Sequence, residues 1–81
     1  MPMIEMRDLI DNIAKALVDK PEEVVATEIR GENTSLIELR VAKEDIGKVI
    51  GKHGRNADAM RYILMAASKK LRRRFIMEIL G

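Results

Sequence analysis

The spacing of hydrophobic residues predicts an amphipathic helix near the start of the chain. Over residues 5–19 the apolar side chains recur three and four positions apart, which places them on one side of a helix. They are Met6, Leu9, Ile10, Ile13, Ala14, Leu17 and Val18. The helix is expected to end at Lys20, because the residue before a proline disfavours the helical conformation. We expect this helix to cover the core of the protein.

An alternation of apolar and polar residues then predicts two strands, at residues 23–30 and 35–42. In the first strand one face carries Val25, Thr27 and Ile29. In the second strand the inward set is Ile37, Leu39 and Val41, and the outward set is Glu38 and Arg40. The polar residues 31–34 between them, Gly-Glu-Asn-Thr, are typical of a turn. Two strands this close in sequence should form an antiparallel hairpin.

The second half of the chain predicts two helices and a last strand. A short helix is expected over residues 43–50, a longer one over about 56–70, and a strand over 74–80. The inward stripe of the longer helix is Ala57, Met60, Ile63, Leu64, Ala67 and Leu71, and that of the strand is Phe75, Met77 and Ile79. The predicted order is α-β-β-α-α-β, an α+β fold in which three helices cover one face of a three-stranded sheet. We expect one domain over residues 1–81.

Composition excludes several classes of protein. The 81 residues include no Cys, no Trp and one His, so that a disulfide scaffold and a zinc site are both excluded. No apolar run is long enough to span a membrane, and charged residues follow Met1 too soon for a secretory signal. We therefore expect a soluble domain in a reducing compartment, the cytoplasm. No nucleophile–base pair and no cofactor motif is visible, which predicts that the protein is not an enzyme and needs no cofactor.

The small net charge of +2 conceals an asymmetry between the halves of the chain. Residues 1–42 carry five basic and nine acidic residues, whereas residues 43–81 carry ten basic and four acidic residues. Such an asymmetry is typical of a protein that binds a polyanion on one face. The basic residues could equally serve to solvate two helices, and charge alone does not decide between these interpretations.

The most informative stretch is residues 46–55, Ile-Gly-Lys-Val-Ile-Gly-Lys-His-Gly-Arg, between the two predicted helices. Gly51 and Gly54 permit a tight reversal and a close approach of another backbone. The next helix begins there, and its free amides favour a phosphate, as do basic residues close by in sequence. Alternatively, the glycines only end one helix and pack against the next. A nucleotide-binding P-loop is excluded, because the spacing is wrong and His53 stands where the motif needs Ser or Thr.

In this context the pattern Ile-Gly-x-Val-Ile-Gly-x-x-Gly-Arg between two helices resembles the signature of KH domains, and the element order resembles the type II arrangement. Pro21-Glu22-Glu23-Val24, the predicted strand 36–42 and the ending 75–80 are similar to the KhpA (YlqC) family of small single-KH bacterial proteins. KH domains clamp about four nucleotides of a single strand at a GxxG loop. The resemblance thus implies an RNA-binding protein, a post-transcriptional regulator or RNA chaperone linked to cell division, cell shape and cell-wall organisation.

The resemblance also assigns residues to a single-stranded RNA site. They are Ile46, Gly47, Lys48, Val49, Ile50, Gly51, Lys52, His53, Gly54 and Arg55. Ile46, Val49 and Ile50 would form an aliphatic floor for the bases, opposite Ala57 and residues near Val41. The scarcity of aromatic residues fits this interpretation, because an aliphatic groove needs no stacking platform. His53 is expected to be an exposed loop residue that can touch phosphate.

Two further features allow more than one interpretation. The basic run at residues 69–74 either complements the end of a helix or adds contacts to phosphates.

The longer helix also carries apolar residues away from its inward stripe, which suggests a second packing partner. We predict a dimer interface at Tyr62, Met65 and Ala66. The resemblance implies a homodimer, or a heterodimer with a larger KH protein of the KhpB/EloR/Jag type. An adaptor that acts mainly through such contacts is the alternative function.

Overall fold

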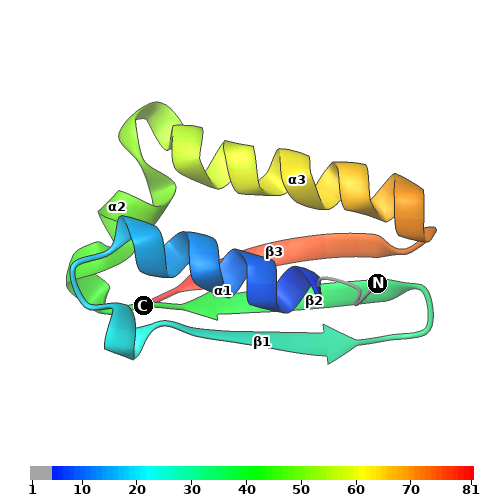
Figure 1. Ribbon diagram of the computed structural model, residues 1–81, viewed down its shortest axis with the longest axis horizontal. Coiled ribbons are helices and arrows are strands. Elements are labelled where there is room, and N and C mark those ends of the chain that lie inside the picture. The colour runs from blue at the N-terminus through cyan, green and yellow to red at the C-terminus, as the bar shows by residue number, and fades with distance from the viewer. Residues whose placement is uncertain (1–4) are drawn as a thin grey trace.

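The structure, a computed structural model, describes residues 5–81 and confirms the predicted α+β order (Figure 1). The helices are α1 (Met6–Leu17), α2 (Ile46–Ile50) and α3 (Arg55–Leu71). The strands are β1 (Val25–Arg30), β2 (Thr34–Arg40) and β3 (Arg74–Leu80). Single turns of 3-10 helix precede β1 (Pro21–Glu23), α2 (Lys43–Asp45) and α3 (Lys52–Gly54). The elements therefore lie within a few residues of the ranges that the hydrophobic pattern predicts.

The three strands form one mixed sheet in the order β1-β2-β3. β1 and β2 are antiparallel, which confirms the predicted hairpin, and β2 and β3 are parallel. Parallel neighbours need a crossover connection, which here consists of α2 and α3. All three helices lie on the same face of the sheet, with α1 and α3 running along it (Figure 1). The opposite face of the sheet is left open to solvent.

The core lies between the sheet and the two long helices. Its fully buried side chains of largest volume include Ile10 from α1, Ile37 and Leu39 from β2, and Met60 and Leu64 from α3. Burial of each such side chain contributes about 1.5–3 kcal/mol to the hydrophobic free energy. The inward sets predicted for β2 and β3 are confirmed, since Ile37, Leu39, Val41 and Met77 are buried and Phe75 and Ile79 pack against them.

The structure settles one point that the hydrophobic pattern leaves open and corrects another. Val25 and Ile29 share a face of β1, as predicted, and this is the open face, where each side chain is about half exposed. Val24 and Ala26 point toward the helices instead. In α3, Ile63 and Leu71 were predicted to face inward and are exposed, which corrects the inward stripe to Ala57, Met60 and Leu64, with Ala67 half-buried. Because α1 and α3 share one face of a narrow sheet, each of them buries only a thin stripe.

Arg73, in the connection between α3 and β3, holds the turn between β1 and β2 through hydrogen bonds. Its Nε donates to Ser35 Oγ at 2.8 Å, and its two terminal nitrogens donate to the carbonyl oxygens of Gly31, Glu32 and Thr34. Ser35 is fully buried, and its hydroxyl donates in turn to Glu28 at 2.6 Å. One guanidinium therefore ties the crossover to the turn between β1 and β2.

Within the described residues 5–81, no helix is both long enough and apolar enough to cross a bilayer.

Candidate nucleic-acid interface

The turn between α2 and α3 is built from backbone conformations that few residues adopt. Gly51 has φ 79° and ψ 170°, a region open almost only to glycine. His53 and Gly54 follow with φ 58° and φ 74°, both in the left-handed region. The amide of Gly51 donates to the carbonyl of Gly47 at 2.8 Å, and that of Gly54 donates to the carbonyl of Gly51 at 3.0 Å. The chain thus reverses within one turn of 3-10 helix, and His53 takes a left-handed conformation that the sequence pattern did not indicate.

The glycines of this turn are needed for different reasons. A Cβ on Gly51 would lie 2.6 Å from Cγ of Asn56, whose side-chain amide donates to the carbonyl of Lys48 at 2.9 Å. Gly51 is therefore required by the packing of the turn itself. A Cβ on Gly47 or Gly54 would meet nothing within 4 Å. The surface above these two glycines is open, and another backbone can approach it closely.

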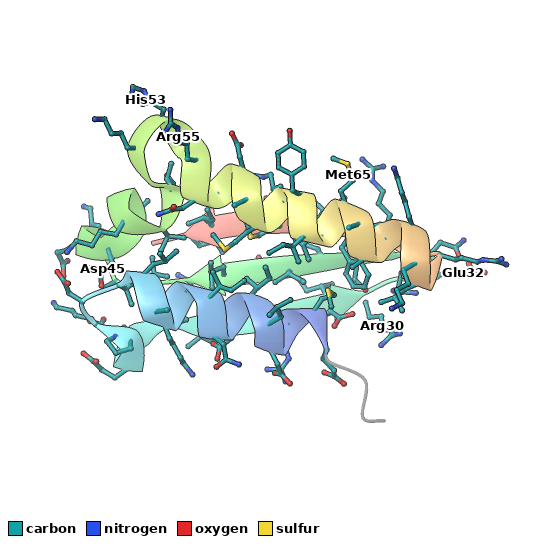
Figure 2. All side chains as sticks on the ribbon, turned by 45° about the horizontal axis from the view of Figure 1, so that its top comes forward. Arg30, Glu32, Asp45, His53, Arg55 and Met65 are labelled. Carbon is teal, nitrogen blue, oxygen red and sulfur yellow. The ribbon has the colours of Figure 1, made fainter. Side chains whose placement is uncertain are left out.

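Positive charge is concentrated at the tip of the turn. The cations Lys52 and Arg55 are exposed, as is His53 between them in sequence, and His53 and Arg55 project outward, away from the sheet (Figure 2). Within residues 5–81 none of the three takes part in an ion pair. The start of α3 lies at the same place and adds the partial positive charge of its first amides. Together these groups make the tip of the turn electropositive.

Lys48 is placed differently from the other predicted cations. Its ammonium group forms an ion pair with Asp19, just after α1, and lies 3.9 Å from the carboxylate of Asp45. The hydrogen bond to Asp19 raises the pKa of Lys48 above its ordinary value. Lys48 therefore joins α2 to the segment after α1, and its charge is already neutralised by a carboxylate of the chain.

Asp45 holds the start of α2 against the segment that follows α1. Its side chain is 2% exposed and accepts hydrogen bonds from the backbone amides of Asp19 at 3.3 Å and Lys20 at 3.0 Å. Next to it, Lys20 donates to Glu44 at 2.7 Å. This hydrogen bond raises the pKa of Lys20 and lowers that of Glu44. The position of the turn thus depends on polar contacts with the segment that follows α1.

The aliphatic residues that the sequence predicts for base binding differ in their exposure. Ile50 is 39% exposed and Ile46 is partly exposed, so that both reach the surface of α2. Val49, Ala57 and Val41 are at most 3% exposed. These three lie beneath the surface, which Ile46 and Ile50 reach.

A groove, which sequence reasoning missed, lies between α3 and β3. It has a volume of about 340 Å³ and is lined by Arg61, Leu64, Met65, Ser68, Arg74, Phe75, Ile76 and Met77. The sequence gives a weak signal for it, since Arg61, Met65 and Ser68 are spaced to share one side of a helix. Arg74 comes from β3, so only the fold reveals that the two arginines line the same groove.

The outer side of α3 carries the residues predicted to form a dimer interface. Tyr62 is 69% exposed and Met65 is 53% exposed, and Ala66 is exposed beside them. Met65 points away from the sheet (Figure 2). A shallow depression on this side is lined by Asp58, Arg61, Tyr62 and Met65. The residues described contain no cluster of three or more His, Cys, Asp or Glu that could hold a metal ion.

The basic run at residues 69–74 separates into two kinds of residue. The guanidinium of Arg73 is hydrogen-bonded to the turn between β1 and β2 and to the start of β2. The others, Lys69, Lys70, Arg72 and Arg74, are exposed, and no ion pair within residues 5–81 involves them. Their charges are available to an external partner.

Comparison with known proteins identifies close relatives. A family model described as "KhpA/KhpB, KH domain" matches residues 7–79. The chain is 52% identical over 75 residues to the RNA-binding protein KhpA of Caldanaerobacter subterraneus, covering 93% of this chain and all of that protein. It is 49% identical over 79 residues to the protein of the same name from Treponema pallidum, covering 96% of this chain and 99% of that protein.

Among solved structures, an Aquifex aeolicus Era variant bound to GDP and aluminium fluoride has a similar fold. The TM-score is 0.58 at 17% sequence identity, over 93% of this chain and 29% of that chain. At this identity the likeness concerns the fold alone.

Proposed function

The chain belongs to the KhpA/KhpB KH-domain family, and from this premise we propose that it is a single KH domain that binds single-stranded RNA at the turn between α2 and α3. The observation that carries the proposal is the open surface above Gly47 and Gly54, flanked by Lys52 and Arg55. A phosphodiester backbone can lie against such a surface without meeting a side chain. The relatives named RNA-binding protein KhpA support RNA as the ligand.

In this proposal the backbone and the bases of the RNA are held by different groups. The phosphates lie at the turn, near Lys52, His53 and the start of α3, where partial and full positive charges coincide. The bases lie on the exposed aliphatic side chains of Ile46 and Ile50. A single turn of this kind contacts about four nucleotides, so that affinity is weak and falls steeply with salt.

The test is RNA binding by the double variant Lys52→Asp/His53→Asp. Both side chains are exposed, and aspartate tolerates the left-handed conformation of His53, so that the fold should be preserved. The matched control is Asn12→Asp/Lys15→Glu, which changes the net charge equally on the exposed side of α1. We expect the loop variant to lose RNA binding and the control to retain it. Equal affinity in the folded loop variant and the wild type would contradict the proposal.

The cellular role that we propose is that of a cytoplasmic post-transcriptional regulator or RNA chaperone, linked to cell division and envelope homeostasis. It follows from the likeness to the KhpA family and from the absence of any chemistry beyond binding among the residues of the turn. We propose binding rather than catalysis for the same reason. RNA crosslinking in cells, followed by sequencing of the bound transcripts, would test this role.

A second candidate function is that of an adaptor that pairs with another KH protein. It is favoured by the exposure of Tyr62 and Met65 on α3, since exposed aromatic and methionine side chains are enriched in protein interfaces. The partner would be a second copy or a KhpB/EloR/Jag-type protein. Sedimentation should reveal a dimer in the wild type and a monomer in Tyr62→Asp. A strict monomer at tens of micromolar would exclude the homodimer.

A further inference from the structure

The face of the sheet opposite the helices carries a row of aliphatic side chains. Ile29, Leu36 and Ile76 lie side by side across the three strands, because Ile29 pairs with Leu36 and Leu36 pairs with Ile76. Their neighbours Ile37 and Met77 are buried under the helices, which places the row on the open face. Among the described residues 5–81, no helix or strand covers this face (Figure 1). The row is therefore an apolar surface without a partner in the folded chain.

Charged residues border this row on both sides. On one side, Glu38 and Glu78 lie opposite each other in the parallel pairing of β2 and β3. On the other side lies Arg74, which also borders the groove beside α3. Within residues 5–81 none of these three residues forms an ion pair. Like charges at directly paired positions destabilise a sheet, so the two carboxylates carry a repulsion that the folded chain leaves uncompensated.

We propose that this face packs against the same face of a second copy of the chain, with the strands of the two sheets antiparallel. A two-fold axis along the aliphatic row sets each residue of the row over its own counterpart. The same axis sets Arg74 of each copy over Glu78 of the other, because both residues lie on β3 two positions from Ile76. The charge pattern is therefore complementary to itself, as a two-fold interface requires.

The dimensions of packed sheets allow these contacts. Two sheets that pack face to face lie about 10 Å apart, with strand directions within about 30° of each other. Two positions along a strand correspond to about 7 Å, and the long side chains of Arg74 and Glu78 can span the remaining offset. A two-fold axis along β2 would instead set Glu38 over its own counterpart, and repulsion opposes that arrangement.

The position of the carboxylates also decides between possible occupants. Glu38 and Glu78 lie at the centre of the face, where they repel a polyanion, so this surface does not suit RNA. The helix α3 lies on the other face of the sheet, so the contact leaves Tyr62 and Met65 free. A chain with two such self-complementary faces can join dimers into larger assemblies. The inference does not depend on RNA binding at the turn.

The association through this face should be weak. The three strands span about 10 Å by 20 Å, which is smaller than a standard interface between proteins. The aliphatic row supplies the affinity, whereas the exposed pairs of Arg74 and Glu78 mainly fix the register. Protein at roughly millimolar concentration is therefore needed to populate the contact.

The test uses Tyr62→Asp as the parent protein, so that α3 does not contribute, and it contains no RNA. In an NMR concentration series up to about 1 mM, the amides of Leu36 and Ile76 should shift. The variants Arg74→Glu and Glu78→Arg should each weaken the association about tenfold, because each turns two attractive pairs into two repulsive ones. Circular dichroism checks that both variants are folded.

Two combinations should restore the association. In an equimolar mixture of the two variants, one copy carries two negative groups at these positions and the other carries two positive groups, so both contacts become attractive again. The double variant Arg74→Glu/Glu78→Arg restores them within one chain at unchanged net charge. The matched controls are Lys69→Glu and Glu22→Arg, which reverse the same charges at exposed positions outside the sheet. Alone and mixed, they should behave as the parent protein does.

Several results would overturn the proposal. One is a concentration series that shifts no amide of the open face, or shifts only those of α3. Another is a mixture of Arg74→Glu and Glu78→Arg that associates no more strongly than either variant alone. A third is a mixture of the two control variants that gains as much as the mixture of the sheet variants, because net charge alone would then explain the attraction. None of these results would affect the proposed binding of RNA at the turn.

Discussion

Replacement of Arg73 by lysine should destabilise the protein, whereas the same change at Arg74 should have almost no effect. The guanidinium of Arg73 donates four hydrogen bonds to the turn between β1 and β2. A lysine ammonium keeps the charge but lacks the planar fork that reaches several acceptors at once. Within residues 5–81, the side chain of Arg74, the next residue along, makes no hydrogen bond, and its backbone amide donates to the carbonyl of Asn33.

The magnitude follows from which of these hydrogen bonds are shielded from water. The bonds to Ser35 Oγ and to the carbonyl of Thr34 are partly buried, whereas those to Gly31 and Glu32 are exposed. A shielded hydrogen bond contributes about 1 kcal/mol net, so that the loss should be about 2 kcal/mol. For a domain of this size, that corresponds to a fall in Tm of roughly 8–16 °C.

Urea unfolding followed by circular dichroism measures this loss directly. Arg73→Lys should shift the midpoint to lower urea at an unchanged slope, and Arg74→Lys should stay within about 0.5 kcal/mol of the wild type. Because both variants keep the charge, neither should weaken RNA binding through electrostatics alone. Equal stability of Arg73→Lys and the wild type, or equal losses in the two variants, would refute the reasoning from the hydrogen bonds.

Four further predictions concern the turn and its support. Gly47→Ala should stabilise the protein by about 0.5–1 kcal/mol, because alanine is the better helix former, and the added methyl group should weaken RNA binding in titrations. Gly51→Ala should destabilise the protein in urea unfolding, because a Cβ at Gly51 clashes with Asn56 and Gly51 has a positive φ. Asp45→Ala leaves two backbone amides without their carboxylate, and calorimetry should show a loss of about 2–4 kcal/mol. An NMR titration should find the pKa of Glu44 below its ordinary value, mainly because of the hydrogen bond from Lys20, and Lys20→Gln should raise it toward that value. The contribution of this pair to stability is complete above the ordinary glutamate pKa and is lost as pH falls through the lowered one.

The fold was predictable where one face of an element is fully buried. β2 lies in the middle of the sheet, and its alternation of buried Ile37 and Leu39 with polar residues marks the inward face clearly. β1 is an edge strand, and its helix-facing side carries Ala26 and Glu28, so its larger apolar residues occupy the open face. The predicted period of two is therefore correct for β1, but side-chain size along the strand does not indicate which face turns toward the helices.

The candidate site was predictable only in its local part. The glycine spacing and the cations of the turn can be read from adjacent residues. The ion pair between Lys48 and Asp19 joins residues 29 positions apart, and the contacts of Arg73 span 38 to 42 positions. Such pairings depend on the crossover and the hairpin, which sequence spacing does not specify. For the same reason the groove between α3 and β3, with Arg61 and Arg74 along it, became visible only in the folded chain.

The arrangement of charge explains why RNA bound at the turn should respond to salt. Within residues 5–81 every ion pair lies between Arg7 and Lys48, so the cations from Lys52 onward form no ion pair. They are spread along α3, from the turn to the connection with β3. The helix is about 25 Å long, whereas the Debye length is about 8 Å at physiological ionic strength and about 30 Å at 0.01 M salt. At physiological salt a short RNA at the turn is therefore attracted by the cations of the turn alone. At low salt the cations at the far end of α3 also contribute, so that affinity should rise by more than the contacts at the turn would give.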